Sequence, residues 1–113
     1  MNIPQPLNPQ VLDSVTQTFK ALADNTRAQI IYLLTQQEMN VNALCEAVGV
    51  SQPTVSHHLA KLHSIRLVKR RREGTQIFYS VDDSHVGNLF KEALWHLDHV
   101  RKNIPDFQFD HEV

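Results

Sequence analysis

Four potential metal ligands, one carboxylate and three imidazoles, lie near the C-terminal end of the sequence. Asp83 and His85 come first, and His96 and His99 follow. At about 100° per residue, the three histidines share one stripe of a helix, but His85 and His96 are about 16 Å apart along its axis. One chain therefore cannot bring both ends of the set to a single ion. Two such helices, packed antiparallel about a two-fold axis, would place the first pair of one chain beside the second pair of the other.

This donor set predicts a zinc site. One carboxylate and three imidazoles form a tetrahedral set of nitrogen and oxygen ligands that suits zinc, with cobalt or nickel as alternatives. Histidines at i and i+3, such as His96 and His99, can reach the same ion. Asp82 could cap the helix or compete with Asp83 as a ligand, and His111 could add a further ligand. The competing interpretation is that these are ordinary surface residues of an amphipathic helix.

A helix-turn-helix is predicted in the middle of the chain. A short helix with apolar residues at helical spacing ends at Gly49, the residue type that suits the left-handed backbone at a helix C-terminus. Ser51 then caps the next helix, with Pro53 in its first turn, where a missing N–H costs nothing. Two short helices joined by a tight, glycine-containing turn form a helix-turn-helix.

A β-hairpin and further helices surround this motif. Apolar periodicity predicts two earlier helices, at 9–23 and from 24 or 25 to 35, and a last helix at 83–102. Alternating residues and a turn predict a hairpin with strands at 67–72 and 75–81. The hairpin turns at Glu73-Gly74 and forms a basic wing. The predicted fold is mainly α (α+β): a winged helix-turn-helix with a two-stranded wing, in one domain over 1–113, with an irregular arm at 1–8 and a flexible tail at 104–113.

The second helix of the motif and the wing are predicted to bind DNA. A recognition helix enters the major groove with its N-terminal residues at the base edges, where Gln pairs with adenine and Ser or Thr contact bases or phosphates. No acidic residue lies between Ala47 and Arg72, so this basic segment suits the phosphate backbone. The expected DNA-binding residues are Gln52, Pro53, Thr54, Ser56, His57, His58, Lys61, Arg70, Arg71, Arg72, Thr75 and Gln76.

The sequence resembles the ArsR/SmtB family of bacterial metal-sensing repressors from about Val15 to Val100. Four segments carry the resemblance: FKALADNTRAQIIYLL (Phe19–Leu34), VGVSQPTVSHHLAKL (Val48–Leu62), LVKRRREGTQIFYSV (Leu67–Val81) and DDSHV (Asp82–Val86). The run SQPTVSHHL is especially specific for the family's recognition helix. The resemblance implies a homodimer formed through the N- and C-terminal helices, which binds operator DNA and is released by metal, so that efflux or sequestration genes are transcribed.

The resemblance also distinguishes between the metal sites known in the family. The branch with its sensor site on the C-terminal helix shows D-x-H followed by H-x-x-H, which the four ligand positions of this chain match. Arsenic, cadmium and lead sensors instead place thiolates at the positions that Asn40 and Asn42 occupy here. That second type of site is therefore not expected, and the single Cys45 is expected to be a buried core residue.

Composition limits the remaining alternatives. A chain of 113 residues with one cysteine, a net charge of −1 and no long apolar run suits a small cytoplasmic protein without a membrane segment. Four protein ligands would leave a zinc ion no open position for water, and no H-E-x-x-H pattern is present, so a zinc hydrolase is not expected. The main alternative is a regulator of the same fold that senses no metal.

Overall fold

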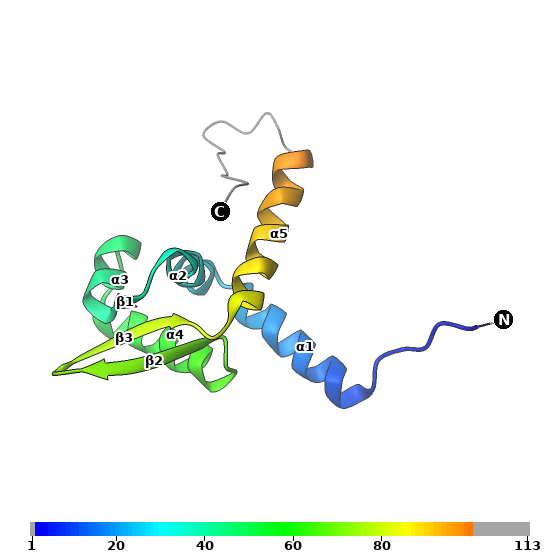
Figure 1. The fold of residues 1–113 in the computed structure, drawn as a ribbon, viewed down its shortest axis with the longest axis horizontal. Coiled ribbons are helices and arrows are strands. Elements are labelled where there is room, and N and C mark those ends of the chain that lie inside the picture. The colour runs from blue at the N-terminus through cyan, green and yellow to red at the C-terminus, as the bar shows by residue number, and fades with distance from the viewer. Residues whose placement is uncertain (1, 101–113) are drawn as a thin grey trace.

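The computed structural model describes residues 2–100 and contains five helices and three short strands within that range (Figure 1). In chain order the elements are α1 (Pro9–Leu22), α2 (Asn25–Gln36), β1 (Met39–Asn40), α3 (Val41–Val48), α4 (Gln52–Ser64), β2 (Val68–Glu73), β3 (Gln76–Val81) and α5 (Ser84–Val100). Residues 2–8 precede α1 without helix or strand, and the expected tail at 104–113 lies outside the described residues. No helix in the described range is both long and apolar enough to cross a membrane.

Local capping residues set the helix boundaries around the helix-turn-helix. Asp24 caps α2, with its carboxylate accepting the N–H of Arg27 at 3.0 Å. Helix α3 ends at Gly49, whose φ of +79° is the left-handed conformation expected there. Ser51 accepts the N–H of Thr54 and caps α4. The predicted helix-turn-helix is confirmed as α3 and α4.

The wing belongs to a three-stranded antiparallel sheet rather than to an isolated hairpin. The strand order is β1-β3-β2, and β1 pairs only with Phe78 and Tyr79 of β3. The two-stranded wing is confirmed as β2 and β3, but the third strand was not predicted, because two residues carry no periodic pattern. The predicted turn was one residue too early: Glu73 pairs with Gln76, so Gly74 (φ +64°) and Thr75 form the turn.

The core lies between α2, the helix-turn-helix and the sheet. Its fully buried side chains come from α2, α3, α4 and β2: Ile30, Ile31, Leu44, Val55, Leu59, Leu62 and Val68. Each helix contributes one apolar face, as its spacing predicted. This core joins the recognition helix to the wing as one rigid unit.

Helices α1 and α5 project from that unit in different directions (Figure 1). The N-terminal half of α5 packs on α2, where the rings of Tyr32 and Phe90 stack at 5.6 Å and Gly87 faces Thr35. The remaining surfaces of α1 and α5 expose large apolar side chains, namely Val11, Leu12, Val15, Phe19, Leu89, Leu97 and Val100. Exposed apolar stripes on two helices mark a surface that a second protein chain covers.

Candidate nucleic-acid interface and metal-ligand residues

Helix α4 presents a polar face to solvent at its N-terminal end. Its apolar residues Val55, Leu59 and Leu62 are fully buried, which fixes the rotation of the helix. The opposite face exposes five of the expected DNA-binding residues: Gln52, Pro53, Ser56, His57 and Lys61. These side chains have the position and chemistry that a recognition helix needs to contact base edges and phosphates.

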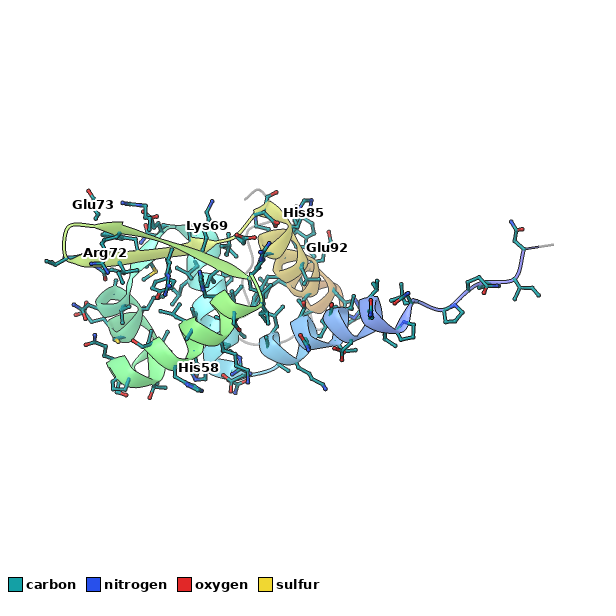
Figure 2. The ribbon with its side chains drawn as sticks, turned by 90° about the horizontal axis from the view of Figure 1, so that it is seen from below. His58, Lys69, Arg72, Glu73, His85 and Glu92 are labelled. Atoms are coloured by element: carbon teal, nitrogen blue, oxygen red, sulfur yellow. The ribbon has the colours of Figure 1, made fainter. Side chains whose placement is uncertain are left out.

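Two of the expected DNA-binding residues on α4 also make contacts within the chain. Thr54 is half-buried, and its hydroxyl lies 2.9 Å from that of Ser51 in the helix cap. His58 is also half-buried, and its Nδ1 lies 3.3 Å from Nη1 of Arg27 on α2 (Figure 2). In the same group, the Arg27 backbone N–H holds the pKa of Asp24 below its ordinary value. His58 therefore connects α4 to the start of α2.

The three wing arginines differ in their surroundings. Side chains alternate along β2, so Arg70 and Arg72 lie on the sheet face that also carries buried Val68 and Tyr79, while Arg71 lies on the other face. The side chains of Arg70 and Arg72 are exposed and make no hydrogen bond or ion pair with the part of the chain that the structure describes. Arg71, by contrast, is held by acidic side chains of its own chain. The exposed side chains of Arg70 and Arg72, like that of Lys69, are thus available to phosphate.

The tip of the wing and the start of the recognition helix meet around one shallow hollow. Gln52 of α4 lines it together with Thr75 and Gln76 of the wing, and the other walls include Asn40 and Asn42. Asn40 Nδ2 donates to Gln76 Oε1 at 2.8 Å. The sequence analysis predicted Gln52, Thr75 and Gln76 as DNA-binding residues. It mentioned Asn40 and Asn42 only as positions where other family members carry metal-binding cysteines. No sequence signal places them here, because the contact depends on the third strand.

Asp83 and His85 lie together at the exposed start of α5. His85 Nδ1 is 3.4 Å from Asp83 Oδ1, and the two side chains are 89% and 54% exposed respectively (Figure 2). Asp83 is also the cap of the helix, since its Oδ1 accepts the N–H groups of His85 and Val86 at 2.8 and 3.3 Å. The sequence offered Asp82 as a possible cap of this helix, but Asp83 takes this role.

The other two expected ligands lie at the far end of the same helix. His96 is exposed on α5, and the side chain of His99 lies outside what the structure describes, as does His111. The described part of a single chain brings no three potential ligands together. Exposed carboxylate and imidazole groups do fit zinc. A complete set would need both ends of α5, which a rise of about 1.5 Å per residue keeps apart within one chain.

An exposed recognition helix, joined through a common core to a basic hairpin, defines a winged helix-turn-helix DNA-binding protein. The model of the family of bacterial regulatory proteins called the arsR family matches residues 24–70, the segment from the cap of α2 into the wing. The HTH-type transcriptional regulator KmtR of Mycobacterium tuberculosis is 44% identical over 102 residues, which cover 90% of this chain and 78% of that protein. The chain therefore belongs to the arsR family and is a DNA-binding transcriptional regulator.

Two further comparisons extend this assignment. The chain is 40% identical over 83 residues to a cadmium resistance regulatory protein, a CadC homologue of Staphylococcus aureus, covering 73% of this chain and 69% of that protein. It also resembles the solution structure of a homodimeric winged helix-turn-helix DNA-binding domain from Mycobacterium bovis, with a TM-score of 0.76 and 36% identity over 89% of this chain and 97% of that chain. The predicted fold is confirmed, and these relatives are regulators rather than enzymes.

Proposed function

We propose that the protein is a metal-responsive repressor that binds operator DNA as a homodimer and is released by zinc, with cobalt or nickel as alternatives. Release would allow transcription of metal efflux or sequestration genes. The observation that carries this proposal is the pair of exposed donors, Asp83 and His85, 3.4 Å apart at one end of a helix whose other end exposes His96. Such a half-set becomes a complete zinc site only if a second chain supplies the remaining ligands.

The exposed surface of α5 supports a dimer that would complete the set. Leu89, Leu97 and Val100 are exposed on the same helix as the two histidines. The homologous domain from Mycobacterium bovis is a homodimer. Two copies of α5 packed antiparallel would bury the apolar residues and bring Asp83 and His85 of one copy beside His96 and His99 of the other. Symmetry would then give two equivalent sites per dimer.

A metal shared between two chains would act on DNA binding through the angle between them. The bound ion supplies a fixed attachment between the two α5 helices. Helix α5 packs on α2 through Tyr32 and Phe90, and α2 shares its core with the recognition helix. A change at α5 therefore changes the separation of the two recognition helices, which must match half-sites about 34 Å apart. By linkage, zinc must bind the DNA-bound dimer more weakly by the same factor that it lowers DNA affinity.

The test is DNA binding measured by fluorescence anisotropy on a duplex from the region upstream of the protein's own gene, first with chelator and then with one zinc per chain. We expect zinc to lower the affinity by about 5- to 150-fold, the usual range for allosteric coupling. His96→Asn should keep the metal-free affinity and lose the zinc response. Asn88→Ala, at another exposed position of α5, is the matched control and should respond like the unmodified protein.

Two results would separate this proposal from its main alternative. Tight DNA binding that is indifferent to zinc, cobalt and nickel would identify a regulator of the same fold that senses no metal. A full zinc response in His96→Asn would show that the sensor uses other ligands. Because protons compete with metal for the histidine nitrogens, the response should also weaken at acidic pH.

A further inference from the structure

The guanidinium group of Arg71 in the wing is held by acidic side chains of its own chain, although half of the Arg71 side chain is exposed. Its Nε lies 2.9 and 3.0 Å from the two carboxylate oxygens of Glu38, and its Nη2 lies 2.7 Å from one of them. Its Nη1 donates to Glu73 at 2.8 Å, and its Cζ lies 4.8 Å from the centre of the Phe78 ring. Every nitrogen of the guanidinium group thus has an acceptor within the chain, so another anion would have to compete with Glu38 and Glu73 for it.

These contacts run across the whole sheet. Arg71 on the outer strand β2 pairs with Phe78 on the central strand β3, and Phe78 pairs in turn with Asn40 on β1. The arginine side chain passes over the Phe78 ring and ends on Glu38, in the connection between α2 and β1. The side chain of Arg71 therefore links strand β2 to the segment between α2 and β1.

The wing depends on such ties because most of it is only two strands wide. Strand β1 supports β3 at Phe78 and Tyr79 only, so the part of the hairpin nearer the Gly74 turn has no third strand. A two-stranded hairpin is marginally stable at best in water. The second tie is the hydrogen bond from Asn40 to Gln76, on the edge of the hollow near the recognition helix.

We propose that Arg71 and Glu38 form a clamp that positions the wing on DNA, and that Arg70 and Arg72 supply the wing's phosphate contacts. Charge supports this division, since Arg71 lies between the carboxylates of Glu38 and Glu73, while Lys69 also acts on Glu38. Moving Arg71 to a phosphate would remove the ion-pair partner of both carboxylates beside the DNA backbone. The inference concerns DNA binding alone and does not depend on the metal response.

The experiment compares the salt dependence of DNA binding by the full-length protein and five variants, using the same upstream duplex with chelator present. Arg72→Gln should lower the slope of log affinity against log salt by about 0.9 for each phosphate that the wing no longer neutralises. Arg71→Gln should leave the slope unchanged and lower the affinity by about two- to fivefold, the range that an exposed ion-pair network supports. Glu38→Gln should lower the affinity equally, and the double variant should be no worse than either single one.

The opposite pattern would overturn the clamp. If Arg71 binds phosphate and Glu38 competes for it, Glu38→Gln tightens DNA binding and Arg71→Gln lowers the salt slope as Arg72→Gln does. Arg71→Lys separates charge from geometry, since lysine keeps the charge but cannot bind a carboxylate through two parallel hydrogen bonds. The clamp predicts that Arg71→Lys binds DNA as weakly as Arg71→Gln, whereas a phosphate contact predicts near-normal affinity. Thermal unfolding of each variant confirms that it is folded.

Discussion

The DNA-reading region and the region formed by α1 and α5 differ in how complete they are within one chain. In the first region, the helix-turn-helix and the wing share a fully buried core, and an ion pair links the wing to Glu38, just after α2. In the second region, large apolar side chains remain exposed and the expected metal ligands lie at opposite ends of one helix. The DNA-reading region is thus self-sufficient, whereas the proposed function requires a second copy to complete the other region.

The largest effect is expected from a cavity in the self-sufficient region. Leu59 of α4 is fully buried in the core that joins the recognition helix to the wing. Leu59→Ala should destabilise the protein by about 2–5 kcal/mol, because apolar burial decreases and a cavity is left behind. Urea denaturation followed by circular dichroism measures this difference. A decrease below about 1 kcal/mol would mean that the core is not the unit that holds this region together.

A charged residue on the exposed apolar stripe of α1 should disrupt the dimer rather than the fold of the single chain. Phe19 is 55% exposed in the single chain, beside the other apolar residues of that face. Phe19→Asp should leave the fold of each chain intact but dissociate the dimer. DNA affinity should then fall by about 100-fold or more, because the second half-site no longer binds as part of the same molecule.

Light scattering after size exclusion and DNA anisotropy measure the two consequences of Phe19→Asp separately. Lys20→Asp, the adjacent polar position on α1, is the matched control and should remain dimeric. A dimeric Phe19→Asp variant with normal DNA affinity would show that this face of α1 is not part of the interface.

The same contrast explains what the sequence could predict. Capping by Asp24, Ser51 and Gly49 is a local event, decided by a residue and its next few neighbours, and the structure shows each as expected. The order of helices, hairpin and final helix followed from periodicity. The fold was therefore readable almost completely, with errors confined to the position of the wing turn and the third strand.

The contacts of individual site residues could not be predicted from the sequence in this way. Arg70, Arg71 and Arg72 are identical in type and adjacent in sequence, yet only the middle one is held by Glu38, which is 33 residues away. His58 follows His57 directly but faces Arg27 on another helix. Such contacts depend on strand register and helix rotation in the folded protein, and residue types alone do not encode them. The metal set remains a prediction because its completion requires a second chain.

A smaller, stabilising effect is expected at the C-terminus of the recognition helix. Arg66 has a φ of +63°, in a motif where its N–H bonds to His63 and the N–H of Leu67 bonds to Leu62. Glycine is the usual residue at this position, since a side chain is strained in left-handed backbone. Arg66→Gly should raise stability by about 0.5–1 kcal/mol, after the greater freedom of glycine in the unfolded chain is subtracted.

Thermal unfolding without DNA measures this effect. The end of α3 provides a control in which glycine is replaced by a residue with a side chain. Gly49 has a φ of +79° and nothing within 4 Å of an added Cβ, so Gly49→Ala introduces backbone strain without a clash. It should lower stability by about 1 kcal/mol. If both variants shifted the unfolding midpoint in the same direction, the left-handed backbone at these two positions would not determine the effect of the substitutions on stability.

The smallest effect is a titration that tests the clamp without DNA. The hydrogen bond from Arg71 holds the pKa of Glu38 below its ordinary value of 4.5. A carboxyl whose pKa is depressed in the folded state stabilises the protein above its unfolded pKa, and this contribution disappears as the pH falls through the folded value. Arg71→Gln should therefore raise the pKa of Glu38 towards 4.5, as measured by NMR of the side-chain carboxyl carbon.

The pKa of Asp24, held low mainly by the backbone N–H of Arg27, should not move in that variant. An unchanged Glu38 pKa would mean that the wing and the end of α2 are not joined in solution, and the DNA-reading region would then be less self-sufficient than its core suggests.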